Sequence, residues 1–339
     1  MKMAVQFFFL AMAVSANASA AVHNKDVWRA RNKGAEFDVV FRIVDDEGSP
    51  VVGARCGGWI YMEREKDHGR GYAEYADTNG YVRIAGKSSE WFSVVIRKEG
   101  YYRTMFDVKY PAQDANPPIV DGKWQPYGET RTVVLKRIKN PIEMVETPYR
   151  INKAVSFGKW YGYDIIRSDW TPPHGKGEHL DVLVRLGLTA VNDTSDFRTT
   201  MELCFTNNPY SGVYKVGKDN WSEMKSAYNA DTNAVYQDEI SFEFERHPHK
   251  PIVDTRLSED SYLVFRIRTQ VDASGNLVSA HYGKIYGLWA FFGAMTAPEL
   301  FFNPTPNDTN IEDAETARKS RLGYKQQLEF ERRRKTGGK

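Results

Sequence analysis

The sequence predicts an all-β protein built from two antiparallel β-sandwiches, the second larger than the first and jelly-roll-like. Short runs of alternating apolar and polar residues recur along the 339 residues, and this is the period of a half-buried strand. Turn signals rich in Gly, Asn and Asp separate these runs. Phe, Trp and Tyr make up 13% of the chain, and such residues favour strands. A chain of this length exceeds one ordinary core, so we expect two domains.

Residues 1–20 are predicted to be a signal peptide. Lys2 gives a basic start, the run from Ala4 to Val14 is almost wholly apolar, and Ala18-Ser19-Ala20 has the small-x-small pattern of a cleavage site. The apolar run is too short to cross a bilayer as a helix, and no later run is longer and equally free of charge. We therefore expect cleavage after Ala20 and a secreted or periplasmic protein whose mature chain has no membrane span.

The first sandwich is predicted over residues 35–140. Residues 72–75 and 81–84 flank the turn Asp77-Thr78-Asn79-Gly80, and an Asn-Gly pair between apolar runs predicts a hairpin. Residues 111–128 contain four prolines and are expected to form a long surface loop. About seven short strands in about 100 residues suffice for a small sandwich. The expected strands are 37–44, 51–62, 72–75, 81–84, 91–97, 101–108 and 130–138.

Three strings in this first domain resemble a known module. They are Glu47-Gly48-Ser49-Pro50-Val51-Val52-Gly53-Ala54, then residues 77–84, then Val94-Val95-Ile96-Arg97-Lys98-Glu99-Gly100-Tyr101. Together they resemble the carboxypeptidase regulatory-like, or transthyretin-like, domain, although the middle string reads Ala-Asp-Thr-Asn-Gly where that family has Thr-Asp. The resemblance implies a small antiparallel sandwich that accompanies other domains and is rarely catalytic. Metallocarboxypeptidases carry a His-x-x-Glu pair, and no histidine of this chain has Glu three residues later.

The second β-rich domain is predicted over residues 141–310. The turn at 272–276 lies between two apolar runs, so residues 262–285 should form a hairpin. Residues 221–228 are expected to form a short helix or helical turn. The charged tail, 311–339, fits neither strand nor helix period well and is expected to be a frayed helix or disordered. The expected strands are 181–188, 199–206, 212–216, 238–245, 262–271, 278–292 and 297–302.

Charge and motif content exclude several classes of protein. Lys and Arg number 46 against 44 Asp and Glu, and only the tail around Arg332 to Lys335 is strongly basic, so we expect no nucleic-acid partner. The chain has no Gly-x-Ser-x-Gly nucleophile motif and no Gly-x-x-x-x-Gly-Lys phosphate loop. No cofactor is expected.

Two groups of residues are candidates for a metal site. His247 and His249 lie two apart on an extended segment, so their imidazoles point the same way. His174, His179 and Asp181 form the second group, with the carboxylate as a third ligand type. Both stretches are rich in turn residues, and the alternative interpretation is ordinary loop polarity.

Three glutamates are the candidates for catalysis if the protein is an enzyme. Glycoside cleavage needs two carboxylates about 5 to 9 Å apart. Glu243 and Glu245 lie on one strand face at about 7 Å, and Glu202 is expected on a neighbouring strand. The alternative is that these glutamates form the solvated face of a sheet.

Four aromatic residues gather near glycines and a proline-rich loop, namely Trp160, Tyr161, Tyr163 and Trp170. Their rings could stack on sugar rings as a ligand-binding surface, or they could fill a seam between the domains. The two cysteines, Cys56 and Cys204, permit one disulfide in an oxidising compartment. Their alternation patterns favour two separate buried thiols.

The predicted function is an exported non-catalytic β-sandwich protein that binds a ligand or is associated with the cell envelope. Its partner would be a polysaccharide or another envelope protein. The alternative is a polysaccharide-active enzyme, either a glycoside hydrolase or a lyase, that uses the paired carboxylates. A third hypothesis is a metal-dependent binding protein that uses the histidine loops.

Overall fold

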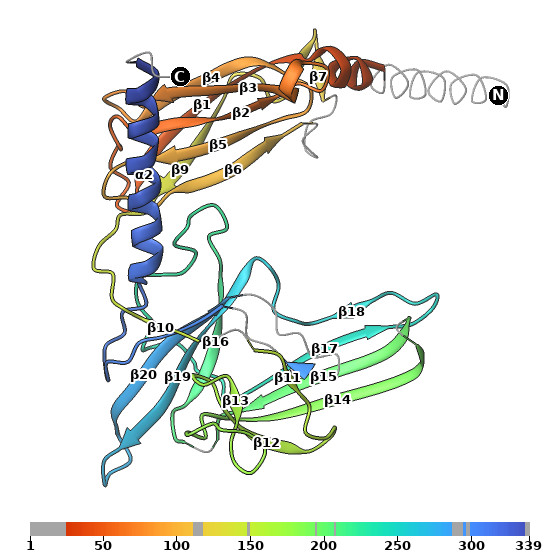
Figure 1. The fold of residues 1–339 in the computed structure, drawn as a ribbon, viewed down its shortest axis with the longest axis vertical. Helices are drawn as coiled ribbons and strands as arrows, with labels where there is room; N and C mark the ends of the chain where they lie inside the picture. The colour runs from red at the N-terminus through yellow and green to blue at the C-terminus, as the bar shows by residue number, and fades with distance from the viewer. Residues whose placement is uncertain are drawn as a thin grey trace, which may run out of the picture. The chain divides into compact units, whose positions relative to one another are not determined.

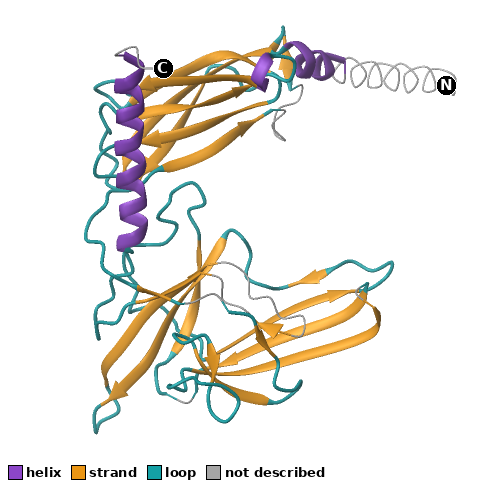
Figure 2. Ribbon diagram, in the orientation of Figure 1, coloured by secondary structure: helices purple, strands orange, loops and turns teal. Residues whose placement is uncertain are grey.

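A computed structural model describes residues 25–110, 118–147, 150–193, 195–206, 208–286, 294–295 and 299–335. The predicted signal peptide and most of the first half of the predicted 111–128 loop lie outside the described residues. The described chain is mainly β-strands in several sheets, so the all-β, sandwich-type prediction is confirmed (Figures 1 and 2). Within these ranges, no helix has both the length and the apolar character needed to span a membrane.

The chain divides into two compact units. Unit 1 contains the residues up to Ile138 together with Trp221–Glu223 and the segment from Lys319 onward. Unit 2 contains Lys139–Asn220 and Met224–Arg318. Each unit has its own buried apolar core.

Unit 1 is a sandwich of two sheets. In the first sheet β1 pairs antiparallel with β4 and parallel with β8 and β9, and β7 pairs with β8. The second sheet has the antiparallel order β3-β2-β5-β6. Stacking of Phe37 on Phe92, with ring centroids 4.4 Å apart, joins the two sheets in the core. The strands are β1 (Ala35–Asp45), β2 (Arg55–Tyr61), β3 (Gly69–Tyr75), β4 (Tyr81–Ser88), β5 (Trp91–Arg97), β6 (Thr104–Lys109), β7 (Ile119–Val120), β8 (Lys123–Trp124) and β9 (Glu129–Leu135). A single 3₁₀ turn, η1 (Lys66–His68), precedes β3.

The hairpin predicted between residues 72–75 and 81–84 is wrong, although its turn forms. The N–H of Asp77 donates to the carbonyl of Tyr81, as a hairpin turn requires. Beyond that bond β3 pairs with β2, whereas β4 pairs with β1 in the opposite sheet. The two strands separate because β4 pairs with the longer β1, where its Val82 and Ile84 are buried in the core, whereas β3 joins the edge of the other sheet beside β2.

The Asp-x-x-Gly turns at 45–49, 77–81 and 272–276 share one geometry. In each, the aspartate Oδ1 accepts the N–H groups of the third and fifth residues. The glycine at the fourth position has φ of 82°, 79° and 84°, a conformation that glycine adopts at little cost. The same local chemistry therefore makes a tight turn whether the flanking strands stay in one sheet or separate.

Unit 2 contains two larger sheets, ordered β13-β12-β14-β15-β17-β18 and β10-β22-β20-β19-β16, and a small β11-β21 pair. Its core takes apolar side chains from both, for example Val184 and Met201 from one and Phe265 and Ile285 from the other. The predicted 262–285 hairpin is confirmed by the pairing of β19 with β20. The strands are β10 (Val145–Glu146), β11 (Asn152–Lys153), β12 (Trp160–Asp164), β13 (Asp169–Trp170), β14 (Val182–Asp193), β15 (Asp196–Cys204), β16 (Gly212–Gly217), β17 (Glu239–Arg246), β18 (Val253–Asp254), β19 (Ser261–Val271), β20 (Leu277–Tyr286), β21 (Ala294–Met295) and β22 (Glu299–Phe302).

The charged tail forms a continuous helix, α2 (Ala314–Lys335), and residues 25–33 are also helical. Asp313 caps α2, because its Oδ2 accepts the N–H and the hydroxyl of Thr316 at 2.7 and 2.8 Å. The residues of α2 from 319 onward belong to unit 1, where the helix crosses the ends of the β3-β2-β5-β6 strands (Figure 1). Several contacts of this part are polar, which explains why an apolar helix pattern is weak in the sequence.

The short helix predicted at 221–228 is wrong. The carbonyl of Trp221 accepts the N–H of Met105, and the N–H of Glu223 donates to the carbonyl of Arg103. Residues 221–223 thus form extended pairing beside the start of β6. These edge hydrogen bonds outweigh the local helix preference, which was the only basis for the prediction.

Candidate functional site

The three glutamates considered for catalysis all lie on the solvent face of a sheet in unit 2 and are ion-paired. The Nε of Arg185 donates to Oε1 of Glu202 at 3.0 Å. The Nε of Arg198 lies 2.5 Å from Glu243 and 3.6 Å from Glu245. The hydrogen bond from Arg198 lowers the pKa of Glu243, so this carboxyl holds no proton at neutral pH to donate as a general acid.

The histidines at 247 and 249 do not form the predicted metal site. The Nε2 of His247 lies 2.7 Å from Glu245, and its Nδ1 is hydrogen-bonded to Asp196. His249 is exposed, in a turn with φ of 64°. Within the ranges that the structure describes, no three His, Cys, Asp or Glu side chains gather in a way that could hold a metal ion.

The second predicted metal group is also dispersed. His174 packs edge-on against Tyr161 with ring centroids 4.9 Å apart, and His179 is exposed. Asp181 is buried and accepts from Arg268 at 2.9 Å. Burial raises the pKa of Asp181, while the hydrogen bond from Arg268 opposes that rise. This carboxylate therefore serves a buried ion pair in unit 2.

The four aromatic residues proposed as a ligand surface do not form one. Tyr163 is 1% exposed and Trp170 is 5% exposed, and both are part of the core of unit 2. Tyr161 is half-buried and packs edge-on against Trp170. Trp160 is 39% exposed and lies against the guanidinium of Arg185 at 4.6 Å. Only Trp160 is well exposed, because strand alternation turns its neighbours inward.

The two cysteines are free thiols in different units. Cys56 faces the core of unit 1, and burial raises the pKa of its thiol to about 12. A thiol with so high a pKa is almost wholly protonated at neutral pH and is a poor nucleophile. Cys56 is therefore a core residue, as the alternation pattern favoured.

A groove that the sequence did not indicate lies on the outer face of the β3-β2-β5-β6 sheet, beside α2. Its volume is about 710 Å³, within the usual range of small-ligand sites. We call it the arginine groove. It is lined by Arg55, Gly57, Gly58, Trp59, Gly71, Tyr72, Ala73, Val95, Arg97, Gln327 and Phe330.

Small residues make this face hollow. A Cβ on Gly57 would lie 2.4 Å from Nη1 of Arg55 and 2.9 Å from the carbonyl of Tyr72, so the guanidinium lies against bare backbone. Trp59 is 38% exposed, with its ring 3.8 Å from the Cβ position of Gly71. The floor of the groove is thus glycine and alanine, and an aromatic ring stands beside it.

The charges around the arginine groove are unbalanced. Arg55 is paired with Glu331 of α2, which also accepts from the hydroxyl of Tyr75 at 2.7 Å. Arg103 pairs with Glu223 at 2.6 Å. The Nε of Arg97 is buried and has no hydrogen-bond partner in the described ranges. The carboxylate that attracts its charge is Glu223, which is already paired with Arg103.

The pairing register explains why the positive charge of Arg97 is in an unfavourable position. Arg97 lies directly opposite Arg55 in the β2–β5 ladder, and Arg103 comes just before the β6 residue that faces Ile96. Burial lowers the pKa of Arg97, and repulsion from Arg103 and Arg55 lowers it further. Like charges directly opposite on neighbouring strands are destabilising. An anion held at Arg97 would relieve this.

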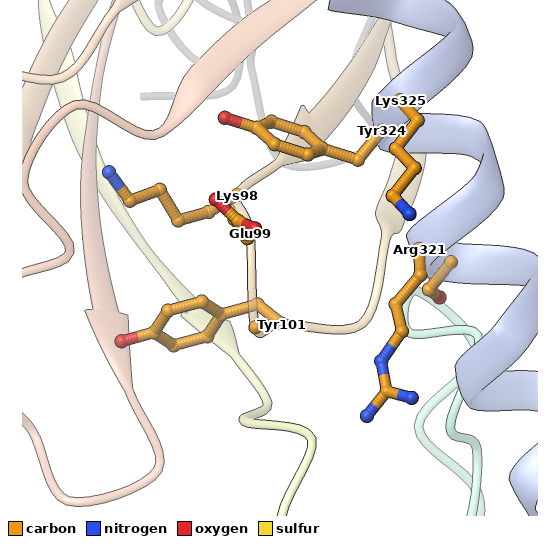
Figure 3. Close-up of a pocket in the computed structure, with 8 residues that line it drawn as sticks. Lys98, Glu99, Tyr101, Arg321, Tyr324 and Lys325 are labelled. Carbon is orange, nitrogen blue, oxygen red and sulfur yellow. The ribbon is translucent and has the colours of Figure 1, made fainter.

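A second, smaller cleft lies where α2 passes the turn between β5 and β6. Its volume is about 330 Å³. Figure 3 shows the rings of Tyr101 and Tyr324 on opposite sides of Lys98 and Glu99. Ser320, Arg321 and Lys325 of α2 also line it, so three cationic side chains accompany one carboxylate. We call this the tyrosine cleft.

The two hollows share one kind of lining. Their linings combine aromatic rings with cations. Ser320 of the tyrosine cleft donates a hydrogen bond to Glu223, and that carboxylate is ion-paired with Arg103. Arg97 lines the arginine groove, and the next residue, Lys98, lines the tyrosine cleft. The signal was absent from the sequence because the three arginines come from separate strand patterns, and only the register brings them together.

Comparison with known proteins gives no assignment. No family model and no curated protein matches the chain. Among solved structures, 3-chlorocatechol 1,2-dioxygenase from Rhodococcus opacus 1CP is 13% identical over 32% of this chain and 62% of its own, with a TM-score of 0.26. Hydroxyquinol 1,2-dioxygenase from Pseudomonas putida DLL-E4 is 14% identical over 31% of this chain and 58% of its own, with a TM-score of 0.24. The chain therefore spans less than two thirds of these dioxygenases.

A protein of the DUF3823 family from Parabacteroides merdae ATCC 43184 is 7% identical over 80% of this chain and 100% of its own, with a TM-score of 0.20. Likenesses at these TM-scores support no conclusion about fold or function.

Proposed function

We propose that the protein is an exported, non-catalytic binding module that holds a polysaccharide in the arginine groove. The observation that carries the proposal is Arg97, a half-buried cation whose Nε has no hydrogen-bond partner among the described residues, in a hollow with an exposed aromatic ring. A buried charge without a partner lowers stability, so its presence beside a groove favours a role in binding.

The lining suits a sugar in two ways. The ring faces of sugars carry C–H groups that pack on aromatic side chains such as Trp59 and Phe330. The glycine floor lets a flat ring approach the backbone, while the guanidinium of Arg97 offers donors to hydroxyl or carboxylate oxygens. An exported location is part of the proposal, and it is supported by the signal-peptide pattern of residues 1–20.

The enzyme hypothesis has less support. The carboxylates on which it depends are ion-paired with arginines on a solvent face, and the pKa of Glu243 is lowered. The resemblance of the first domain to transthyretin-like modules also implies an accompanying, rarely catalytic role. We therefore retain binding without cleavage as the proposed activity.

The test is polysaccharide binding by the purified full chain in affinity gel electrophoresis, together with an assay for new reducing ends. The proposal predicts retardation by at least one polymer and no new reducing ends. Trp59→Ala should weaken binding about tenfold, whereas Trp28→Ala, an exposed tryptophan outside the groove, should not. Cleavage of a bound polymer, or equal effects of the two substitutions, would contradict the proposal.

A further inference from the structure

We propose that the polysaccharide is acidic and that Arg97 binds a carboxylate of its uronic acid residues. This inference rests on the proposed function and names its ligand class. It is argued from three features of the described residues: the charge count, the strand register and the neighbouring cleft.

The charge count around the arginine groove leaves one cation over. Arg55 has Glu331, and Arg103 has Glu223, so two of the three guanidiniums are neutralised by the protein. Arg97 is the third, and its Nε has no hydrogen-bond partner among the described residues. The carboxylate that attracts it, Glu223, is shared with Arg103, so two carboxylates face three guanidiniums. A ligand carboxylate would supply the missing negative charge, whereas a hydroxyl group would leave the excess in place.

The register makes an anion more favourable than a neutral acceptor. Arg97 faces Arg55 across the β2–β5 ladder, so its charge is repelled at short range and is screened little because the side chain is half-buried. A guanidinium matches a planar carboxylate with two parallel N–H···O bonds. Binding a carboxylate therefore gains both the geometry and the relief of repulsion.

The tyrosine cleft suggests a polymer with repeated charges. Lys98, the residue after Arg97, lines this cleft, and Arg321 and Lys325 join it against the single carboxylate of Glu99. In Figure 3 the side chains of Arg321 and Lys325 extend from the same stretch of α2. A chain of uronic acids carries one carboxylate per residue, so neighbouring sugars would meet cations along the same path.

The experiment is isothermal titration of the purified full chain with polygalacturonate, polymannuronate and polyglucuronate, each compared with its methyl ester of matched length. We expect at least one acid form to bind at least tenfold more tightly than its ester, and this difference to shrink as salt concentration rises. Arg97→Gln should bind the acid and the ester alike, and Arg97→Lys should retain part of the preference. Arg42→Gln, an exposed arginine on β1 outside both hollows, is the matched control.

The outcomes separate this inference from the proposed function. Equal binding of acid and ester by the unaltered protein would overturn the acidic-ligand inference and leave polysaccharide binding intact. Equal loss of preference in Arg97→Gln and Arg42→Gln would overturn the role of Arg97. Binding of none of these polymers in either form would overturn the inference, and failure in the broader electrophoresis test would overturn the proposed function itself. The comparison of acid and ester uses the unaltered protein, so it does not depend on the folding of any variant.

Discussion

Replacing Arg97 with methionine should make the ligand-free protein more stable. Methionine keeps an unbranched stem of similar length but removes a guanidinium whose Nε is buried and without a hydrogen bond. An unsatisfied buried donor costs about 1–3 kcal/mol, and a like charge directly opposite costs up to about 1 kcal/mol. Because Arg97 is only half-buried, solvent screening reduces both costs, and we expect a gain of about 1 kcal/mol in the free energy of unfolding.

Hydrogen exchange is the assay that isolates unit 1. The amides of β2 and β5 report the opening free energy of the sheet that carries Arg97, without assuming that both units unfold together. A gain of about 1 kcal/mol corresponds to a rise of about 2–4 °C in Tm for a unit of this size. Most core and buried-polar substitutions destabilise, so a stabilising result would be distinctive.

Arg103→Met is the matched control, because Arg103 neighbours Arg97 but pairs with Glu223 at 2.6 Å. Removing it leaves the carboxylate of Glu223 without its arginine, so we expect the unfolding free energy of unit 1 to fall by about 1–2 kcal/mol. If Arg97→Met instead lowered the opening free energy of the β2 and β5 amides by about 1 kcal/mol or more, Arg97 would have a structural partner. That result would refute the inference of an uncompensated charge.

Three further predictions concern other ion pairs. Glu331→Ala should accelerate hydrogen exchange in the second half of α2, because it removes the carboxylate that binds Arg55. Glu329→Ala, at an exposed position of the same helix, should not. Equal protection in the two variants would show that the Glu331–Arg55 pair does not hold the helix. Burial raises the pKa of Asp45, but its hydrogen bonds together outweigh burial and hold the pKa below 3.8. The ionised carboxylate therefore stabilises the fold above about pH 4, and this stabilisation is lost as pH falls through the folded pKa. In urea unfolding from pH 6 to pH 2.5, Asp45→Asn should lose less unfolding free energy than the unaltered protein. Glu243→Gln should bind polysaccharide as tightly as the unaltered protein and should likewise produce no new reducing ends. A changed affinity would place the ligand on the sheet of unit 2 that carries Glu243.

The positions of most strands could be predicted from sequence, but their partners could not. Alternation located β14, β15, β17 and the β19–β20 hairpin, because a half-buried strand must alternate. The Asn79-Gly80 cue predicted a turn correctly and a hairpin wrongly. Turn chemistry is local, whereas the choice of sheet depends on long-range pairing with β1 and β2.

The continuity of the tail helix, which was expected to be frayed or disordered, and the groove were missed for a related reason. Helix α2 is held in part by polar contacts such as Glu331 with Arg55, which leave no apolar stripe to detect. The arginine groove depends on the cross-strand register of Arg55 and Arg97, residues more than forty positions apart. The aromatic group at 160–170 looked more like a ligand surface because its residues were close in sequence, yet alternation buries two of them.

The most direct test of the central claim is a crystal structure of the protein with a short acidic oligosaccharide bound. The account predicts a ligand carboxylate within about 3 Å of the Arg97 guanidinium, with a sugar ring beside Trp59. A ligand seated on the face of β15 and β17 that carries Glu202 and Glu243, with the arginine groove empty, would contradict it.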